Sequence, residues 1–175
     1  MTEHLTLAEL EAGLPEILGS PKDRGKLEAI VVRPERGERL DLSNVGISLA
    51  HGTHGDRWAK GRPTTGDGKP DPDMQICIMN ARAIALIAGE RARWPLAGDN
   101  LFIDMDLSPE NLPTGQRLAI GTAVIEITAT PHDGCDSFVR RFGRDATIFV
   151  NNRRGREHRQ RGVYARVVRD GHVSV

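Results

Sequence analysis

The chain has 175 residues, of which 24 are basic and 24 acidic, so its formal net charge at pH 7 is zero. This length predicts a single domain with a core of ordinary size. A neutral chain has no general attraction for nucleic acid or membrane surfaces, and an aromatic content of 4% argues against a base-stacking surface.

Residues 1–25 are predicted to form a helix and a linker. Thr6 and Glu9 have the spacing of a capping box, and leucines follow at helical spacing. Gly13 and Pro15 are expected to end this helix early, and residues 20–25, SPKDRG, are typical of a linker. The start lacks the basic and apolar regions of a signal peptide, and no apolar run is long enough to span a bilayer. We therefore expect a cytoplasmic protein with no membrane partner.

From Lys26 onward, short runs alternate apolar and polar residues, as half-buried strands do. These runs are KLEAIVVRP, RLDLSNVGISL, MQICIM, DNLFIDMDL, RLAIG, TAVIEITAT and VYARVV. The terminal segment is expected to form a hairpin around Asp170 and Gly171. Seven or eight short strands with few helices predict a mainly β fold, a β-barrel with small helical insertions, over residues 26–175.

Two segments between the strands have clear local predictions. Residues 59–73, AKGRPTTGDGKPDPD, are rich in Gly, Pro and Asp, which predicts a long, mobile surface loop. The next stretch, NARAIALIAGE, predicts a helix with Asn80 as its N-cap and Gly89 at its end.

The two cysteines have different sequence contexts. Cys77 lies inside a strand pattern, which favours a small buried hydrophobic side chain. Cys135 follows a His-Asp-Gly turn and precedes the helical stretch DSFVRRFG, in which Gly143 is a plausible C-cap. A cysteine at a helix N-terminus meets unpaired N–H groups that stabilise a thiolate, although a structural turn cysteine is an equal alternative on this evidence. Neither cysteine is expected to form a disulfide.

Two polar stretches offer weaker signals. His51 and His54 could ligate a metal, but a zinc site needs further ligands, and the alternative is a glycine-rich turn that lines a cleft. Five arginines lie between Arg153 and Arg161. Such a run is usually a solvated surface, yet guanidinium groups also suit phosphate and carboxylate, and binding of nucleic acid is the weakest reading.

In this order, five landmarks make the sequence resemble the MOSC family, named for the C-terminal domain of molybdenum-cofactor sulfurase. The landmarks are Gly55-Asp56-Arg57, Gly98-Asp99-Asn100-Leu101, LPTGQRLAIGTAVIEIT, the Pro131–Cys135 turn with RFG after it, and RGVYARVVRDGHV. The resemblance implies a MOSC-type β-barrel with a few short helices. It also implies one characteristic cysteine, which corresponds to Cys135.

The resemblance implies that Cys135 handles activated sulfur or ligates molybdenum in the molybdenum cofactor. Arg57, Asn100 and His132 would then line the pocket, while Arg153 and Arg154 would hold the phosphate of the pterin. The expected functions are sulfur transfer, or reduction of N-hydroxylated compounds; the alternatives are a non-catalytic cofactor-binding or anion-binding module and an interaction domain. A cysteine desulfurase or a molybdenum-cofactor enzyme would be the protein partner, and a small molecule the ligand. No lysine is identified for pyridoxal phosphate.

Overall fold

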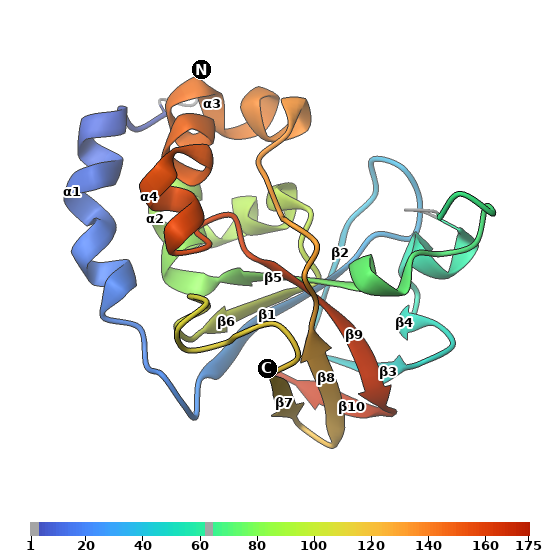
Figure 1. Cartoon of the computed structure of the whole chain (residues 1–175). Helices are drawn as coiled ribbons and strands as arrows, with labels where there is room; N and C mark the ends of the chain where they lie inside the picture. Colours follow the sequence, from blue (N-terminus) through green and yellow to red (C-terminus); the bar gives the residue numbers. More distant parts are fainter. Residues whose placement is uncertain (1–3, 62–64) are drawn as a thin grey trace.

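A computed structural model describes residues 4–61 and 65–175 of the chain. Its main feature is a curled, mixed seven-stranded sheet with the strand order β2-β1-β6-β5-β9-β8-β7 (Figure 1). All neighbouring strands are antiparallel except β5 and β6, which run parallel. The strands are β1 (Lys26–Val32), β2 (Leu40–Leu42), β5 (Ile76–Asn80), β6 (Leu101–Asp104), β7 (Arg117–Ile120), β8 (Ala123–Ile127) and β9 (Val163–Arg169).

A three-stranded sheet with the order β10-β3-β4 completes the barrel-like β structure. It contains β3 (Asn44–Ser48), β4 (Gly52–Thr53) and β10 (Gly171–Ser174). The expected terminal hairpin is wrong, because β10 leaves β9 and pairs with β3, where Val173 lies opposite Val45. The sharp change of direction needs Gly171, since a Cβ there would lie 2.3 Å from the backbone nitrogen of Ala123.

The concave side of the sheets encloses one apolar core. Strand residues alternate between this core and the other face, so one set of side chains from β1, β3, β5, β6, β8 and β9 meets inside the curl. The largest members of this set include Ile30, Ile47, Ile76, Ile78, Leu101 and Ile125. The predicted β-barrel with helical insertions is therefore confirmed.

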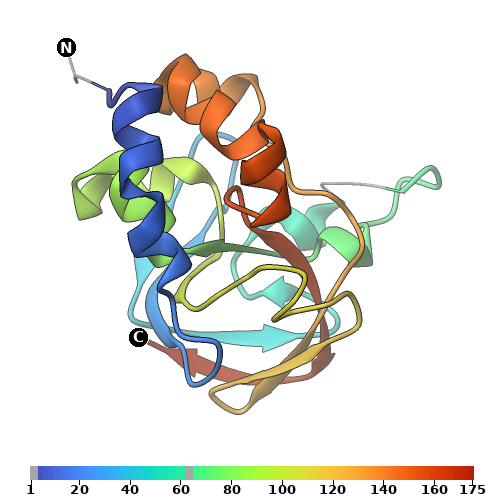
Figure 2. The ribbon, with the colours of Figure 1, turned by 60° about the vertical axis from the view of Figure 1, so that its left-hand side comes forward.

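A layer of helices covers the opposite face of the main sheet and buries a second apolar core (Figures 1 and 2). The layer contains α1 (Leu7–Leu18), α2 (Ala81–Ala88), α3 (Asp136–Asn151) and α4 (Arg153–Glu157), with the 3-10 helix η3 (Arg91–Ala97) beside α2. Phe102 of β6 points into this core together with Phe138 and Phe142 of α3. The site described below lies where this helical layer meets the strand ends.

Helix α1 begins where the sequence predicts but continues past its proline. Thr6 is the N-cap, and both hydrogen bonds of the capping box with Glu9 are formed. The helix includes Gly13 and Pro15 and ends at Leu18, with Gly19 as its C-cap, so the predicted early end is wrong. Its apolar side chains Leu10 and Leu14 are buried in the helical core, and this packing outweighs the local effect of the proline.

Helices α2 and α3 differ in how well the sequence predicted them. The predicted α2 is confirmed: Asn80 accepts hydrogen bonds from the backbone of Arg82 and Ala83, and the C-cap is Gly89. The predicted end at Gly143 is confirmed for the first part of α3, because that residue is non-helical, with φ of 85°. The second part, which continues after this kink to Asn151, was not predicted, and it forms because a further apolar side is buried there.

The loop predicted over residues 59–73 contains short helical turns at both ends. η1 (Arg57–Lys60) overlaps its beginning and η2 (Pro72–Met74) overlaps its end, while residues 62–64 lie outside the described residues. The indole N–H of Trp58 donates a 2.8 Å hydrogen bond to the carbonyl of Asp71 and so joins the two ends. In the described part of the chain, no helix has the length and apolar character that crossing a membrane requires.

Candidate functional site

The site is organised around residues 96–100, here called the loop 96–100, which comprise the last two residues of η3 and the connection to β6. Three guanidinium groups from distant parts of the chain donate to three consecutive carbonyl groups of this loop. The bonds run from Arg141 to Leu96 at 2.8 Å, from Arg161 to Ala97 at 3.0 Å and from Arg33 to Gly98 at 2.8 Å. Gly98 has φ of 87°, a conformation that glycine adopts without strain.

Arg33, Asp56 and Asn100 form a buried network on one side of this loop. The Nε and Nη2 atoms of Arg33 donate to the two carboxylate oxygens of Asp56, at 2.8 and 3.0 Å. The amide of Asn100 donates to Asp56 at 2.9 Å and accepts from the backbone N–H of Cys77 at 3.0 Å. Asn100 is fully buried. Its side chain therefore holds the loop in place and does not line an open pocket.

Arg161, Asp99 and His132 form a second buried network on the other side. Nη1 of Arg161 donates to the carboxylate of Asp99 at 2.7 Å, and its guanidinium carbon lies 5.0 Å from the ring centroid of Phe138. His132 stacks on Tyr164 with 4.2 Å between ring centroids, and its Nδ1 is 3.7 Å from Asp99. Burial, and then the charges of Arg161 and Arg33, lower the pKa of His132 well below 6.5, so the imidazole is neutral.

Cys135 is exposed at the N-cap of α3, as the sequence predicts, while Cys77 is buried; both thiols are free. Partial burial raises the pKa of Cys135, but the backbone N–H groups of Phe138 and Ser137 and the charge of Arg161 outweigh this effect. The resulting pKa is lowered from the ordinary thiol value of 9.0. The first turn of α3 therefore favours the thiolate form of Cys135.

Three further arginines, Arg39, Arg57 and Arg141, bring positive charge to this region. Burial, followed by repulsion from other guanidinium groups that include Arg33, lowers the pKa of Arg39. Burial also lowers the pKa of Arg141, although the negative charge of Cys135 raises it in part. Within the described residues, none of the three has a carboxylate at ion-pair distance. Their charge remains available for an anionic ligand.

Arg57 also lines a separate hollow of about 300 Å³. The other residues that line it are Glu35, Arg36 and Lys60, and Lys60 forms an ion pair with Glu35. Three cations and one carboxylate leave an excess of positive charge at the edge of the site.

The residues predicted for the site take different places. Arg57 belongs to the group of arginines just described, His132 lies behind the Cys135 segment, and Asn100 is buried beneath the loop. Arg153 and Arg154 are exposed on α4, where Arg153 pairs with Glu157, and no hydrogen bond or ion pair in the described part of the chain joins either to Cys135. The last arginine of the same run, Arg161, is the one whose charge acts on Cys135.

The alternative of a metal held by histidines finds no support in the described residues. Nε2 of His54 lies 2.9 Å from the hydroxyl oxygen of Ser48, and the rings of His51 and His54 meet edge to face. No group of three or more His, Cys, Asp or Glu side chains suitable for a metal ion occurs in the part of the chain that the structure describes. His51 lies in the turn between β3 and β4, and His54 directly follows β4.

Sequence reasoning missed Arg33 and Arg39. Arg33 follows a buried strand and precedes a proline, and nothing in that local pattern marks it as a partner of Asp56. Arg161 was noticed only as one member of a charged run. The sequence signal that could point to these arginines is the acidic residue in each of two motifs, Asp56 and Asp99. A buried carboxylate requires a cation from elsewhere in the fold.

A family model described as the MOSC domain matches residues 51–175. This match covers well over half of the chain. The chain belongs to the MOSC domain family. No protein among the curated sequences matches it.

Solved structures show the same MOSC fold at low sequence identity. The YuaD protein from Bacillus subtilis is 18% identical with a TM-score of 0.58, and the alignment covers 86% of this chain and 91% of YuaD. YiiM from Geobacillus stearothermophilus is 14% identical with a TM-score of 0.55, over 86% of this chain and 71% of YiiM. A hypothetical protein is 19% identical with a TM-score of 0.54, over 83% of this chain, which spans only 62% of that protein. These likenesses establish the fold of the MOSC domain.

Proposed function

We propose that this MOSC domain binds the molybdenum cofactor, with Cys135 as the molybdenum ligand. The observation that carries the proposal is an exposed cysteine with a lowered pKa beside arginines that have no carboxylate partner among the described residues. Thiolate is a soft ligand that suits molybdenum, and guanidinium groups suit the phosphate of a pterin. The donor set therefore fits the cofactor of the family.

Each residue of the site has a role that follows from its contacts. The N–H groups of the first turn of α3 keep Cys135 ionised, while Arg161, held by Asp99, adds positive charge. Arg57 and Arg141 would hold the anionic part of the ligand. The cofactor, when bound, would supply molybdenum redox chemistry, and reduction of an N-hydroxylated compound is the activity for which the loaded protein should be assayed.

Sulfur carriage is a second candidate, favoured by the exposure of Cys135. In that reaction the Cys135 thiolate attacks the outer sulfur of a persulfide on a donor such as a cysteine desulfurase. The sulfur–sulfur bond of the donor breaks, a new sulfur–sulfur bond forms on Cys135, and the donor leaves as a thiolate. The free thiols fit a reducing compartment such as the cytoplasm, where we place the protein.

Purification from a host that makes the cofactor tests the proposal. Metal analysis and native mass spectrometry should find about one molybdenum per chain in the wild type and in Cys77→Ser, and none in Cys135→Ser. Arg141→Gln should lower the occupancy without removing Cys135. If the wild type carries one added sulfur on Cys135 and no cofactor, sulfur carriage replaces the first proposal. If Cys135→Ser retains molybdenum, the assigned ligand is wrong.

A further inference from the structure

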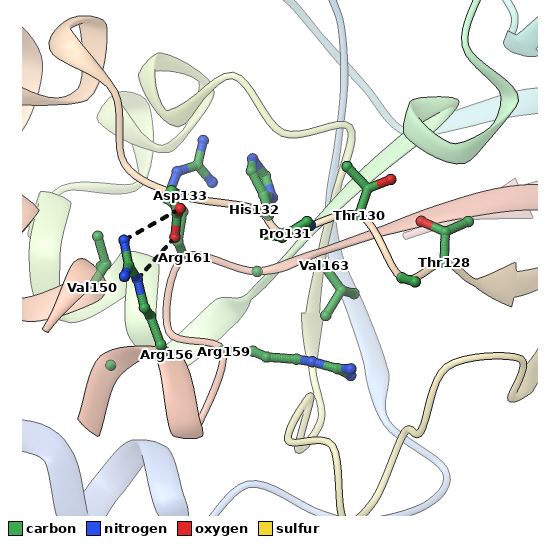
Figure 3. Close-up of a pocket in the computed structure, with 13 residues that line it drawn as sticks. Thr128, Thr130, Pro131, His132, Asp133, Val150, Arg156, Arg159, Arg161 and Val163 are labelled. Carbon is green, nitrogen blue, oxygen red and sulfur yellow. Dashed lines mark hydrogen bonds and ion pairs between the residues drawn. The ribbon is translucent and has the colours of Figure 1, made fainter. Parts of the chain in front are cut away.

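A second cavity, of about 350 Å³, is lined in part by residues 128–133, the stretch that leads toward Cys135 (Figure 3). Its walls come from the stretch after β8, from α4 and from the beginning of β9. The charged and polar lining residues are Thr128, Thr130, His132, Asp133, Arg156, Arg159 and Arg161. Cys135 is not among the lining residues, which in its segment end at Asp133.

The charges that line the cavity do not balance. Arg156 pairs with Asp133 at 3.3 Å, and Arg161 pairs with Asp99 at 2.7 Å. Figure 3 shows Arg156 reaching Asp133, while Arg159 extends in another direction, past Val163. Within the described residues Arg159 has no carboxylate at ion-pair distance. A half-buried guanidinium group in the wall thus lacks a counter-charge.

Arg159 is held in place by backbone carbonyl groups alone. Its Nη1 donates to Leu112 at 2.6 Å and to Leu107 at 3.3 Å, and burial lowers its pKa. Its own backbone has φ of 49°, which is unusual for a residue other than glycine. This residue directly follows His158, the C-cap of α4, so the turn that ends the helix places Arg159 in the cavity wall.

Two buried polar atoms in the same wall also lack partners. Nδ1 of His132 and Nε of Arg161 make no hydrogen bond in the described part of the chain, although their side chains are only 6% and 8% exposed. The 3.7 Å distance from Nδ1 to Asp99 is too long for a hydrogen bond. Buried polar groups are normally paired, so unpaired ones around a cavity indicate a polar occupant.

We propose that this cavity is an oxyanion site, in which Arg156 binds the phosphate group of free phosphate or of a small phosphate ester, while Arg159 and Arg161 add positive charge to the wall. The volume is at the lower end for ligand pockets, so the occupant is small. Guanidinium groups bind phosphate oxygens with short, charge-assisted hydrogen bonds. The proposal does not depend on the cofactor proposed for Cys135.

The ion pair between Arg156 and Asp133 predicts opposite effects on phosphate binding for substitutions of its two members. The carboxylate of Asp133 competes with an incoming anion for the guanidinium of Arg156. Replacing Asp133 with Asn removes one negative charge from the lining and releases Arg156. Asp133→Asn should therefore tighten phosphate binding, whereas Arg156→Gln should weaken it.

The experiment is titration calorimetry of the full chain with inorganic phosphate and, separately, with glycerol phosphate, at constant ionic strength. Phosphate affinity should fall about tenfold in Arg156→Gln, which corresponds to about 1.4 kcal/mol, and rise several-fold in Asp133→Asn. Arg159→Gln should also weaken binding. If that variant does not fold, the opposite effects at Asp133 and Arg156 still decide the matter.

The controls are Arg57→Gln and Arg141→Gln, which alter the Cys135 region and should leave this binding unchanged. Tighter binding of glycerol phosphate than of phosphate would identify an ester as the occupant, and equal binding would identify free phosphate. The proposal is overturned if neither probe binds saturably, or if binding depends on Arg57 or Arg141 and not on Arg156. Loss of molybdenum binding in the earlier experiment would leave these measurements unaffected.

Discussion

The two cysteines show how one side chain takes opposite properties from its surroundings. Burial raises the pKa of Cys77, which the positive charge of Arg33 only partly offsets. Cys135 has a lowered pKa because backbone N–H groups and Arg161 stabilise its thiolate. A cysteine reacts or binds a metal as its thiolate. Of the two cysteines, Cys135 is both exposed to solvent and more readily ionised.

Alkylation with iodoacetamide should therefore modify Cys135 before Cys77 in the native protein at neutral pH. The rate at Cys135 should rise with pH and reach half of its maximum below 9.0, the ordinary thiol value. Peptide mass spectrometry after short reaction times measures both sites in one sample. Earlier labelling of Cys77 would contradict the assignment of the reactive thiol.

His132 should make the protein less stable in mild acid. Its pKa is lowered in the folded state by burial, so the unfolded chain takes up a proton near pH 6.5 while the folded chain does not. Stability is then complete above that pH and is lost as the pH falls below it, by about 1.4 kcal/mol one unit lower. His132→Phe keeps an aromatic ring against Tyr164 but cannot titrate. Urea unfolding at several pH values should show a shallower acid slope for this variant, and an unchanged slope would refute the role of His132.

At the scale of elements, the kink in α3 decides where Cys135 lies. The two parts of the helix fold back so that Asn151 exchanges two hydrogen bonds with the backbone of Gly134, at 2.7 and 2.8 Å. The end of the helix thereby fixes the residue that precedes Cys135. The turn at Gly143 makes this arrangement possible.

Gly143→Ala should destabilise the protein by about 1–2 kcal/mol. Alanine is strained at a φ of 85°, and its Cβ would lie 3.1 Å from the imidazole of His4. Arg144→Ala, at the next and exposed position of α3, is the matched control and should change the free energy of unfolding by less than about 0.5 kcal/mol. Equal effects of the two substitutions in urea unfolding would mean that the kink is not required.

At the scale of the whole molecule, α1 is packed onto the helical layer. Leu14 is 2% exposed in the core that also contains α2 and α3, whereas Leu18 in the same helix is 43% exposed. Leu14→Ala should cost about 2–5 kcal/mol of folding free energy, and Leu18→Ala should cost much less. Thermal and urea unfolding of both variants measure the difference. Similar small losses would show that residues 1–25 contribute little to the fold.

Much of the architecture was predictable because it is encoded by short-range patterns. Alternation predicted the strands, and side-chain capping predicted both the start of α1 and the whole of α2. The failures occurred where distant packing overrides local preference. Pro15 remains inside α1, and β10 pairs with β3 because the chain turns toward the other sheet at Gly171.

The site was less predictable than the fold. The place of Cys135 at a helix start follows from its neighbours in sequence, but the charges around it come from Arg141 and Arg161 through the folded chain. No local signal distinguishes Arg161 from the exposed Arg153 in the same run. Only the need to neutralise the buried Asp99 separates them, and that need appears once the burial is known.

The loop 96–100 has a consequence for the order of folding. Its three carbonyl groups bind arginines that are 45, 64 and 65 positions away in the sequence. Contacts of such separation form late in folding, because the chain must lose the entropy of closing a long loop before the contact stabilises it. In a partly folded chain the N–H groups of the first turn of α3 already act on Cys135, but the charge of Arg161 is still missing. The pKa of Cys135 would therefore reach its full lowering only when the long-range contact between Arg161 and Ala97 has closed.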